Sequence, residues 1–206
     1  MRWCSSAALA PESDKAGVLF YGMAGAGKTA CALELAYRYD PQYLERFTAF
    51  AWHKAPDEAP DGGCDIAGAL VQLAMSLEEQ LPGLELVGLI DDPQDFRRQA
   101  LPRLRALLAS YAILVVLDNL EGLLTPRGDW RDPRWGELVN ALLDHGGLSR
   151  LVLTSRRLPT TLAGHPRVQA EAVHALSLPE SVLLARQLPH LKPLFQDEPG
   201  RERLRR

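Results

Sequence analysis

The chain has 206 residues, of which 47% are hydrophobic and 24% are charged, so it is long enough to form one domain with a packed core. Lysine and arginine number 23 against 26 aspartate and glutamate residues, which gives a formal net charge of −3. These proportions exclude a disordered tail, a collagen-like repeat and a coiled coil throughout. The basic residues are scattered among acidic ones, so no nucleic-acid partner is indicated.

The cysteines and the apolar segments indicate the compartment. Cys4, Cys31 and Cys64 are widely spaced and include no C-x-x-C pair, so neither a disulfide framework nor a zinc site is predicted. The most apolar stretch, residues 106–117, is shorter than the roughly 20 residues that cross a bilayer. Residues 1–11 lack the long apolar core of a secretory signal. We therefore expect a cytoplasmic protein without a membrane partner.

The first predicted element is a buried strand over residues 17–21, which follows a lead-in without periodicity. A glycine-rich loop comes next, and a helix is predicted from Lys28 until Asp40, which precedes a proline. Residues 47–53 are rich in aromatic side chains and predict a second strand. Asp65 is then expected to cap a leucine-rich helix.

Asp92 followed by a proline predicts the start of the next helix, and Pro102 is expected to kink or split it. The aliphatic run at residues 113–117 is typical of a central parallel strand that is covered on both faces. A second Asp-Pro pair at Asp132 predicts another helix, which we expect to close at Gly146-Gly147.

Two further strands are predicted over residues 150–154 and 168–173, and Ser177 with Glu180 forms a capping box before a leucine-rich helix. Strands and helices thus alternate without an internal repeat. The predicted fold class is therefore α/β, with three layers and a mostly parallel central sheet.

Residues 22–29 match G-x-x-x-x-G-K-[ST], the motif of a phosphate-binding loop. Between a strand and a helix, such glycines let backbone N–H groups hold phosphate oxygens, and the helix dipole favours the anion. Lys28 is expected to neutralise the β- and γ-phosphates of ATP or ADP, and Thr29 to offer its hydroxyl to Mg²⁺. The predicted nucleotide-binding residues are Gly22, Met23, Ala24, Gly25, Ala26, Gly27, Lys28, Thr29 and Ala30.

Asp118 follows the central aliphatic strand, so we expect it at the carboxyl edge of the sheet, holding Mg²⁺ directly or through water. The next residue, Asn119, can position a water molecule but cannot accept a proton. Glu121 is a candidate substitute base, and the alternative is an exposed turn acid. Slow or conditional hydrolysis is the expectation.

The strand at residues 150–154 ends with Thr154, and Ser155-Arg156-Arg157 follow it directly. We therefore expect these four polar residues at the same edge of the sheet. Arg156 is suited to reach a γ-phosphate and so to report whether ATP or ADP is bound, and the alternative is a solvated surface arginine. Thr154 is expected to hydrogen-bond the same phosphate or its water. The predicted catalytic residues are Lys28, Asp118, Asn119, Glu121 and Arg156.

The ordered segments GMAGAGKT, LDNLE, LVLTSRR and LSLPESVLLARQL resemble the STAND-type P-loop NTPases, which include the NB-ARC and NACHT modules, and most of all the bacterial NB-ARC-like branch. The resemblance spans residues 17–188, and Arg156 takes the arginine place of the family's T-T-R sensor. It implies an ASCE-type P-loop fold. It also implies a module that binds ADP at rest, exchanges it for ATP and forms a homo-oligomer when ATP is bound.

The same resemblance implies a division into a lead-in over residues 1–16, an NTPase core over 17–174 and the start of a helical, lid- or ARC-like subdomain over 175–206. The glycine-x-proline segment that usually covers the nucleotide is not found before Arg206. We therefore expect the chain to be part of a longer protein, whose winged-helix, repeat or effector domains are its partners.

Three functions fit these residues, and the sequence favours the first. It is a nucleotide-operated switch that binds ATP or ADP with Mg²⁺ and hydrolyses ATP slowly. The second is a small P-loop phosphotransferase, which needs an arginine-rich lid. Residues 125–134 contain three arginines, but the Asp-Pro pair at Asp132 explains that segment as a helix start. The third is a scaffold that binds nucleotide for stability alone. This alternative stays open because Asn119 cannot accept a proton from water.

Overall fold

The computed structural model describes residue 10 and residues 12–37, 47–57, 66–81 and 83–187. The chain divides into two compact units between Val173 and His174. The first unit contains the sheet and its covering helices, and the second contains the helix α8 (Leu178–Gln187). The helix end predicted at Asp40 and the cap predicted at Asp65 lie outside the described residues.

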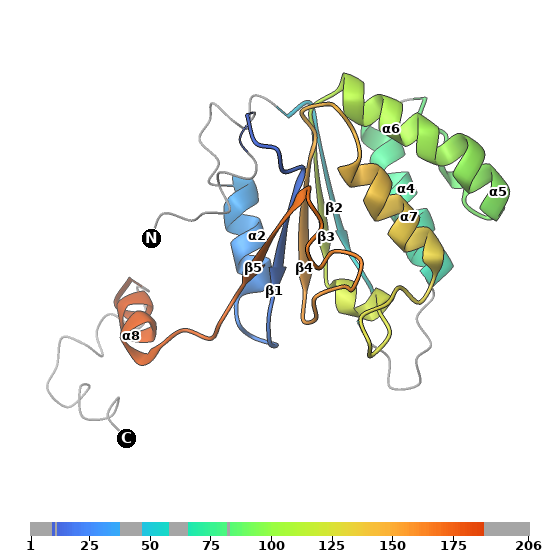
Figure 1. The fold of residues 1–206 in the computed structure, drawn as a ribbon. Helices are drawn as coiled ribbons and strands as arrows, with labels where there is room; N and C mark the ends of the chain where they lie inside the picture. Colours follow the sequence, from blue (N-terminus) through green and yellow to red (C-terminus); the bar gives the residue numbers. More distant parts are fainter. Residues whose placement is uncertain (1–9, 11, 38–46, 58–65, 82, 188–206) are drawn as a thin grey trace, which may run out of the picture. The chain divides into compact units, whose positions relative to one another are not determined.

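The first unit is built on five parallel strands in the order β2-β3-β4-β1-β5 (Figure 1). Because every pair is parallel, all the carboxyl ends lie at the same edge of the sheet. The fold class predicted from the sequence is confirmed. The strands are β1 (Gly17–Tyr21), β2 (Ala49–Lys54), β3 (Ile113–Asp118), β4 (Arg150–Ser155) and β5 (Val168–Ala172).

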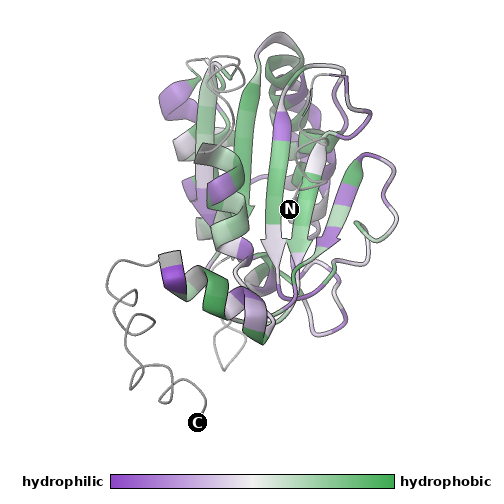
Figure 2. Cartoon of the chain, turned by 90° about the vertical axis from the view of Figure 1, so that its left-hand side faces the viewer, coloured by the Kyte–Doolittle hydropathy of each residue, from purple (hydrophilic) through white to green (hydrophobic). Residues whose placement is uncertain are grey.

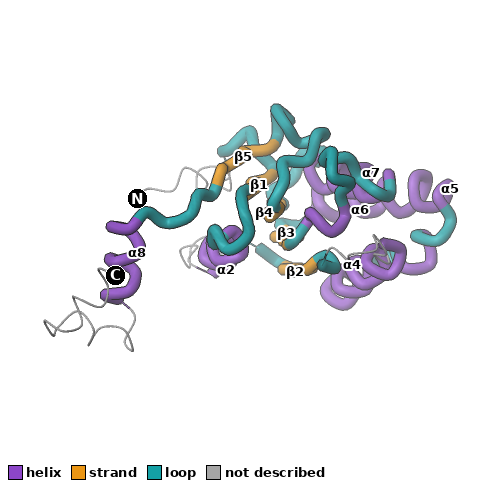
Figure 3. The backbone as a smooth tube through the Cα atoms, turned by 90° about the horizontal axis from the view of Figure 1, so that it is seen from below, coloured by secondary structure: helices purple, strands orange, loops and turns teal. Residues whose placement is uncertain are grey.

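The helices form a layer on each face of the sheet (Figures 1 and 3). From β1 to β2 the chain crosses the sheet in one direction, and from β2 through β3 to β4 it returns in the other. Right-handed crossovers therefore place the first helix on one face and the later ones on the opposite face. Among the helices that the structure describes in the first unit, α2 (Lys28–Tyr37) covers one face, whereas α4 (Ile66–Gln80), α6 (Leu101–Ser110) and α7 (Pro133–Leu143) share the other.

Each face of the sheet has its own hydrophobic core. The larger core, between the sheet and α4, α6 and α7, includes Phe96, Leu104 and Trp135, and the smaller one, under α2, includes Phe20 and Val116. All six residues of β3 are buried, as predicted for a strand covered on both faces. Figure 2 shows mostly hydrophobic strands at the centre of the sheet, whereas the edge strand β5 alternates.

Helix starts follow the sequence closely. The Asp92 carboxylate accepts hydrogen bonds from the backbone N–H groups of Gln94 and Asp95 at 2.6 and 3.0 Å, and so caps α5 (Pro93–Asp95). Pro102 does not break the helical segment. A wider π turn, η2 (Phe96–Ala100), precedes it, and α6 then begins at Leu101. The effect of Pro102 is therefore a local change of helix type rather than a split, because proline has no N–H to donate to the preceding turn.

The predicted end of α7 at Gly146-Gly147 is wrong, because the helix ends at Leu143 with Asp144 as its C-cap. Gly147 has a packing role instead, since a Cβ on this residue would lie 2.7 Å from the Cα of Ala109. The glycine therefore permits close contact with the end of α6 rather than terminating α7.

In the second unit, the predicted capping box is confirmed. The Ser177 N–H donates to the Glu180 carboxylate at 2.9 Å, and the Glu180 N–H donates to the Ser177 hydroxyl at 3.5 Å, so α8 starts as expected. Among the helices that the structure describes, none is both long and apolar enough to span a membrane.

Candidate functional site

The loop of residues 22–27 connects β1 to α2 at the carboxyl edge of the sheet. Gly22, Gly25 and Gly27 have φ values of 149°, 74° and 95°, which L side chains rarely adopt. At Gly22 a side chain is also excluded by space, since a Cβ would collide with the backbone carbonyl of Val173. The loop conformation therefore depends on the glycines of the phosphate-binding motif.

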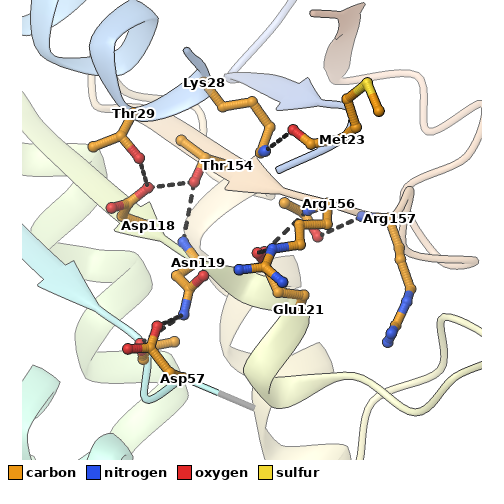
Figure 4. A network of polar contacts seen from close by, with 12 residues as sticks. Met23, Lys28, Thr29, Asp57, Asp118, Asn119, Glu121, Thr154, Arg156 and Arg157 are labelled. Atoms are coloured by element: carbon orange, nitrogen blue, oxygen red, sulfur yellow. Dashed lines mark hydrogen bonds and ion pairs between the residues drawn. The ribbon is translucent and has the colours of Figure 1, made fainter. Parts of the chain in front are cut away.

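Lys28 is the first residue of α2 and is 9% exposed. Its ammonium donates a hydrogen bond to the backbone carbonyl of Met23, at a distance of 2.9 Å (Figure 4). The positive charge is thus held at the loop, beside the first N–H groups of α2, which have no acceptor within the helix. Ala24, Gly25, Thr29 and Ala30 are exposed, so a ligand can approach this end of the helix from solvent.

Asp118, the last residue of β3, is 5% exposed and is hydrogen-bonded to α2, the helix that follows the glycine loop. The Thr29 hydroxyl donates to its Oδ1 at 2.9 Å (Figure 4). Although β4 separates β3 from β1, both strands end at the same edge, so the two residues predicted to serve Mg²⁺ do lie together. A hydroxyl and a carboxylate are oxygen ligands of the kind that Mg²⁺ accepts alongside water and phosphate oxygens.

Thr154, on the intervening strand β4, holds Asp118 from the other side. Its hydroxyl contacts Asp118 Oδ1 and also accepts the Asn119 N–H at 3.0 Å. Because an N–H can only donate, the threonine proton goes to the carboxylate. From the sequence, the predicted partner of this hydroxyl is a phosphate or its water. The sequence does not identify Asp118 as its partner, because no local sequence pattern shows that β4 lies beside β3 in the sheet.

Asn119 adopts the left-handed conformation with φ 70°, which asparagine tolerates better than most residues. Its side-chain nitrogen donates to the carbonyls of Ala55 and Pro56 at 3.2 and 3.3 Å and to the Asp57 carboxylate at 3.0 Å. The amide thereby ties the end of β3 to the segment after β2. The sequence indicates a role for Asn119 in positioning water, but it carries no signal for this contact.

Glu121 is 3% exposed, so the alternative of an exposed turn acid is wrong. It lies on a short 3-10 helix, η3 (Leu120–Leu123). Its Oε1 pairs with Arg156 Nε at 2.8 Å, and its Oε2 accepts the Arg156 backbone N–H at 3.0 Å. The structure thus joins two residues to which the sequence assigned separate roles. Figure 4 shows the Arg157 side chain pointing away from this pair.

The segment that could have supplied an arginine-rich lid is tied down in two places. Arg131 donates to the backbone carbonyl of Leu124 at 2.9 Å. Arg134 donates to the Asp132 carboxylate and to the carbonyl of Ile90. Both arginines therefore hold the start of α7 and its surroundings, as expected of a helix start.

The strand order explains why the site lies at this position. After β1 the chain leaves toward β2, and after β4 it leaves toward β5, so the connections from two neighbouring strands run in opposite directions along the sheet. Ligands of open α/β sheets bind at the carboxyl edge beside such a point. The glycine loop, Lys28, Asp118 and Arg156 all belong to this edge. The fold is therefore a three-layer α/β fold of the P-loop NTPase type.

No protein-family model matches the sequence, and no curated protein is significantly similar to it. Among solved structures, a Signal Transduction ATPase with Numerous Domains (STAND) protein with a tetratricopeptide repeat sensor, from Pyrococcus horikoshii, is similar to 88% of this chain at 19% identity, with a TM-score of 0.46. A chain of a HORMA:CdnC:Trip13 complex from E. coli MS115-1 is similar to 93% of it at 14% identity, with a TM-score of 0.49.

This chain spans 25% of the length of the first of these proteins and 59% of the second. Both TM-scores lie below 0.5, so neither likeness supports an inference about what this chain binds. The functional conclusions below therefore rest on its own residues and their contacts.

Proposed function

We propose that this chain binds ATP and ADP together with Mg²⁺ at the carboxyl edge of its sheet, and that it hydrolyses ATP slowly as a nucleotide-operated switch. One observation carries the proposal: the Lys28 ammonium lies on the glycine loop, and the Thr29 hydroxyl meets the Asp118 carboxylate beside it. One edge thus combines a cation for phosphate oxygens with two oxygen ligands for Mg²⁺. The ion supplies neutralisation of the phosphate charge when it is bound.

The existing contacts of the Asn119 and Glu121 side chains support slow hydrolysis. Asn119 offers an amide rather than a carboxylate, and its nitrogen bonds to the segment after β2. Both carboxylate oxygens of Glu121 accept from Arg156. A general base needs a lone pair within hydrogen-bonding reach of the attacking water. The side-chain nitrogen of Asn119 and both carboxylate oxygens of Glu121 are therefore engaged in other contacts.

Arg156 is the proposed reader of the γ-phosphate. It directly follows Ser155, whose carbonyl accepts the N–H of Gly22 at 3.2 Å, so its backbone lies beside the start of the phosphate loop. Its side chain is 51% exposed. A guanidinium in this place can contact a terminal phosphate that ADP lacks. This difference between the two nucleotides is what a switch requires.

The ordered segments that resemble STAND-type NTPases support a more specific role for this chain. We place the chain as the nucleotide-binding module of a larger signal-transduction regulator of the bacterial NB-ARC-like branch. Its proposed domains are the NTPase core over residues 17–174 and a helical subdomain from residue 175. The remaining domains of a longer cytoplasmic chain, and other copies of it when ATP is bound, are the proposed partners.

A non-hydrolysing scaffold is the second candidate, and the engaged side chains of Asn119 and Glu121 favour it. Phosphate release without any acceptor separates the two, since the switch turns over slowly and the scaffold retains nucleotide without turnover. ADP formation that requires an added acceptor supports a phosphotransferase instead.

Lys28→Ala tests the site directly. Loss of a charge-assisted contact worth about 1.5–3 kcal/mol is expected to weaken ADP binding by roughly tenfold or more in calorimetry. Lys15→Ala is the matched control, because Lys15 precedes β1 and its ammonium bonds to the carbonyl of Pro166. Equal ADP affinity in Lys28→Ala and wild type contradicts the proposed site.

A further inference from the structure

The position of Glu121 is fixed by its surroundings. Its neighbours Leu120 and Leu123 are fully buried, and the turn begins at the left-handed residue Asn119. Gly122 packs against the backbone of Pro56 so closely that a Cβ would not fit. The Glu121 carboxylate is therefore presented from a buried and closely packed turn.

The two oxygens of this carboxylate contact one residue in two different ways. Oε2 accepts the backbone N–H of Arg156 at 3.0 Å and so fixes the main chain where β4 ends. Oε1 pairs with Nε at 2.8 Å and so fixes the near side of the guanidinium. The four Nη N–H groups at the far side are the ones that can bind two oxygens of a phosphate.

We propose that Glu121 is the positioning residue of Arg156, and not a base that activates water. By holding both the backbone and Nε of Arg156, it directs the Nη groups to the γ-phosphate of a nucleoside triphosphate and sets the preference for ATP over ADP. This inference rests on the proposed nucleotide-binding function. It differs from the sequence-based hypothesis in which Glu121 is a candidate substitute base.

The proposal makes Glu121 and Arg156 one functional unit, which a double-mutant cycle detects. The ratio of the affinities for a non-hydrolysable ATP analogue and for ADP, both with Mg²⁺, is measured by calorimetry in wild type, Glu121→Gln, Arg156→Ala and the double variant. Each single variant is expected to reduce that ratio by about fivefold or more, with ADP affinity retained. The double variant is expected to lose no more than either single one.

Glu137→Gln is the matched control. Glu137 on α7 forms an ion pair of the same type with Arg97, at 2.8 Å, between two helical segments of the layer that covers the sheet. This variant is expected to keep the wild-type ratio. Arg156→Lys provides a test that does not disturb the buried carboxylate, since lysine keeps the charge but has a single nitrogen. It cannot contact Glu121 and a phosphate with separate nitrogens, so it is expected to lose the preference as Arg156→Ala does.

Three outcomes would contradict the positioning role of Glu121 or the nucleotide-binding function on which it rests. A Glu121→Gln variant that keeps the wild-type preference but no longer releases phosphate identifies Glu121 as the base and overturns the proposal. Loss of preference in Arg156→Ala alone, with Glu121→Gln unchanged, overturns it as well. If wild type binds neither nucleotide, the proposed function itself is wrong, and this result is distinct from both.

Discussion

At the scale of single residues, Thr154 determines how the Asp118 carboxylate is oriented. The hydroxyls of Thr29 and Thr154 both donate to Oδ1. Two donors on one oxygen fix the rotation of the carboxylate and leave Oδ2 as the oxygen that neither hydroxyl occupies. The Asn119 N–H, which donates to Thr154, completes the chain of contacts from β3 to β4. A buried threonine at the end of β4 thus orients the carboxylate that we propose as a ligand of Mg²⁺.

Thr154→Val removes this hydroxyl with little change in shape. We expect Mg²⁺-dependent ADP binding to weaken more than Mg²⁺-free binding, because Asp118 loses one of its two donors. The unfolding free energy is expected to fall by about 1–3 kcal/mol, since the Asn119 N–H loses its acceptor. Calorimetry with and without Mg²⁺, and urea denaturation, measure the two effects. Thr154→Ser keeps the hydroxyl and serves as the control, and equal losses with and without Mg²⁺ exclude the positioning role.

At the scale of elements, helix starts are decided by a few adjacent residues. The Asp132 carboxylate accepts the Arg134 backbone N–H at 2.9 Å and pairs with its guanidinium, which places an acid at the start of α7. Burial of Asp132 favours its neutral form, but the hydrogen bonds from Arg134 outweigh burial and lower the pKa of this carboxyl. The charged cap therefore stabilises the folded state above the ordinary pKa of aspartate, and this contribution is lost as the pH falls through the lowered pKa.

Asp132→Ala is expected to reduce the unfolding free energy by about 0.5–2 kcal/mol at pH 7, the usual effect of losing an N-cap. The difference from wild type shrinks as the pH falls below about 4, where the wild-type carboxyl begins to be protonated as well. Urea denaturation at several pH values measures both effects. Asp144→Ala is the control, because it removes an acid from the C-terminal end of the same helix. A pH-independent difference contradicts the capping interpretation.

Signals from adjacent residues, such as these helix caps, explain which parts of the structure were predictable from the sequence. The bounds of β1 and the starts of α5 and α7 depend on neighbouring residues, and all three were predicted correctly. The end of α7 was predicted incorrectly, because Gly147 packs against α6, which is distant in sequence, and does not terminate α7. The candidate site divides in the same way. The motif identified Lys28 and Thr29, and the end of the aliphatic strand identified Asp118, whereas the pairing of Glu121 with Arg156 needs the order of the strands.

At the scale of the whole molecule, the first unit buries two histidines that favour the neutral form. Burial lowers the pKa of His53, which stacks on Trp135 with 6.0 Å between ring centroids. Burial, and then the charges of Arg167 and Arg150, lower the pKa of His145. A lowered folded-state pKa means that the unfolded chain binds more protons as the pH falls below the ordinary value of about 6.5. Stability is therefore fully present above that pH and decreases below it.

We accordingly expect the urea midpoint of the first unit to be lower at pH 5.5 than at pH 7.5. His145→Gln removes one of the two responsible groups and is expected to reduce the difference between the two midpoints. His174→Gln, at an exposed position in the second unit, is the control. Identical midpoints at both pH values in wild type contradict the expected cost of protonating these histidines.

The last residue of the first unit lies directly against the start of the phosphate loop. The Val173 N–H donates to the carbonyl of Tyr21 at 2.7 Å, and its own carbonyl occupies the space where a Gly22 side chain would be. The covalent chain leaves the unit at this residue. A displacement of Val173 by the downstream chain is consequently transmitted both to the sheet, through β5 and Tyr21, and to the glycine loop that we propose holds the nucleotide.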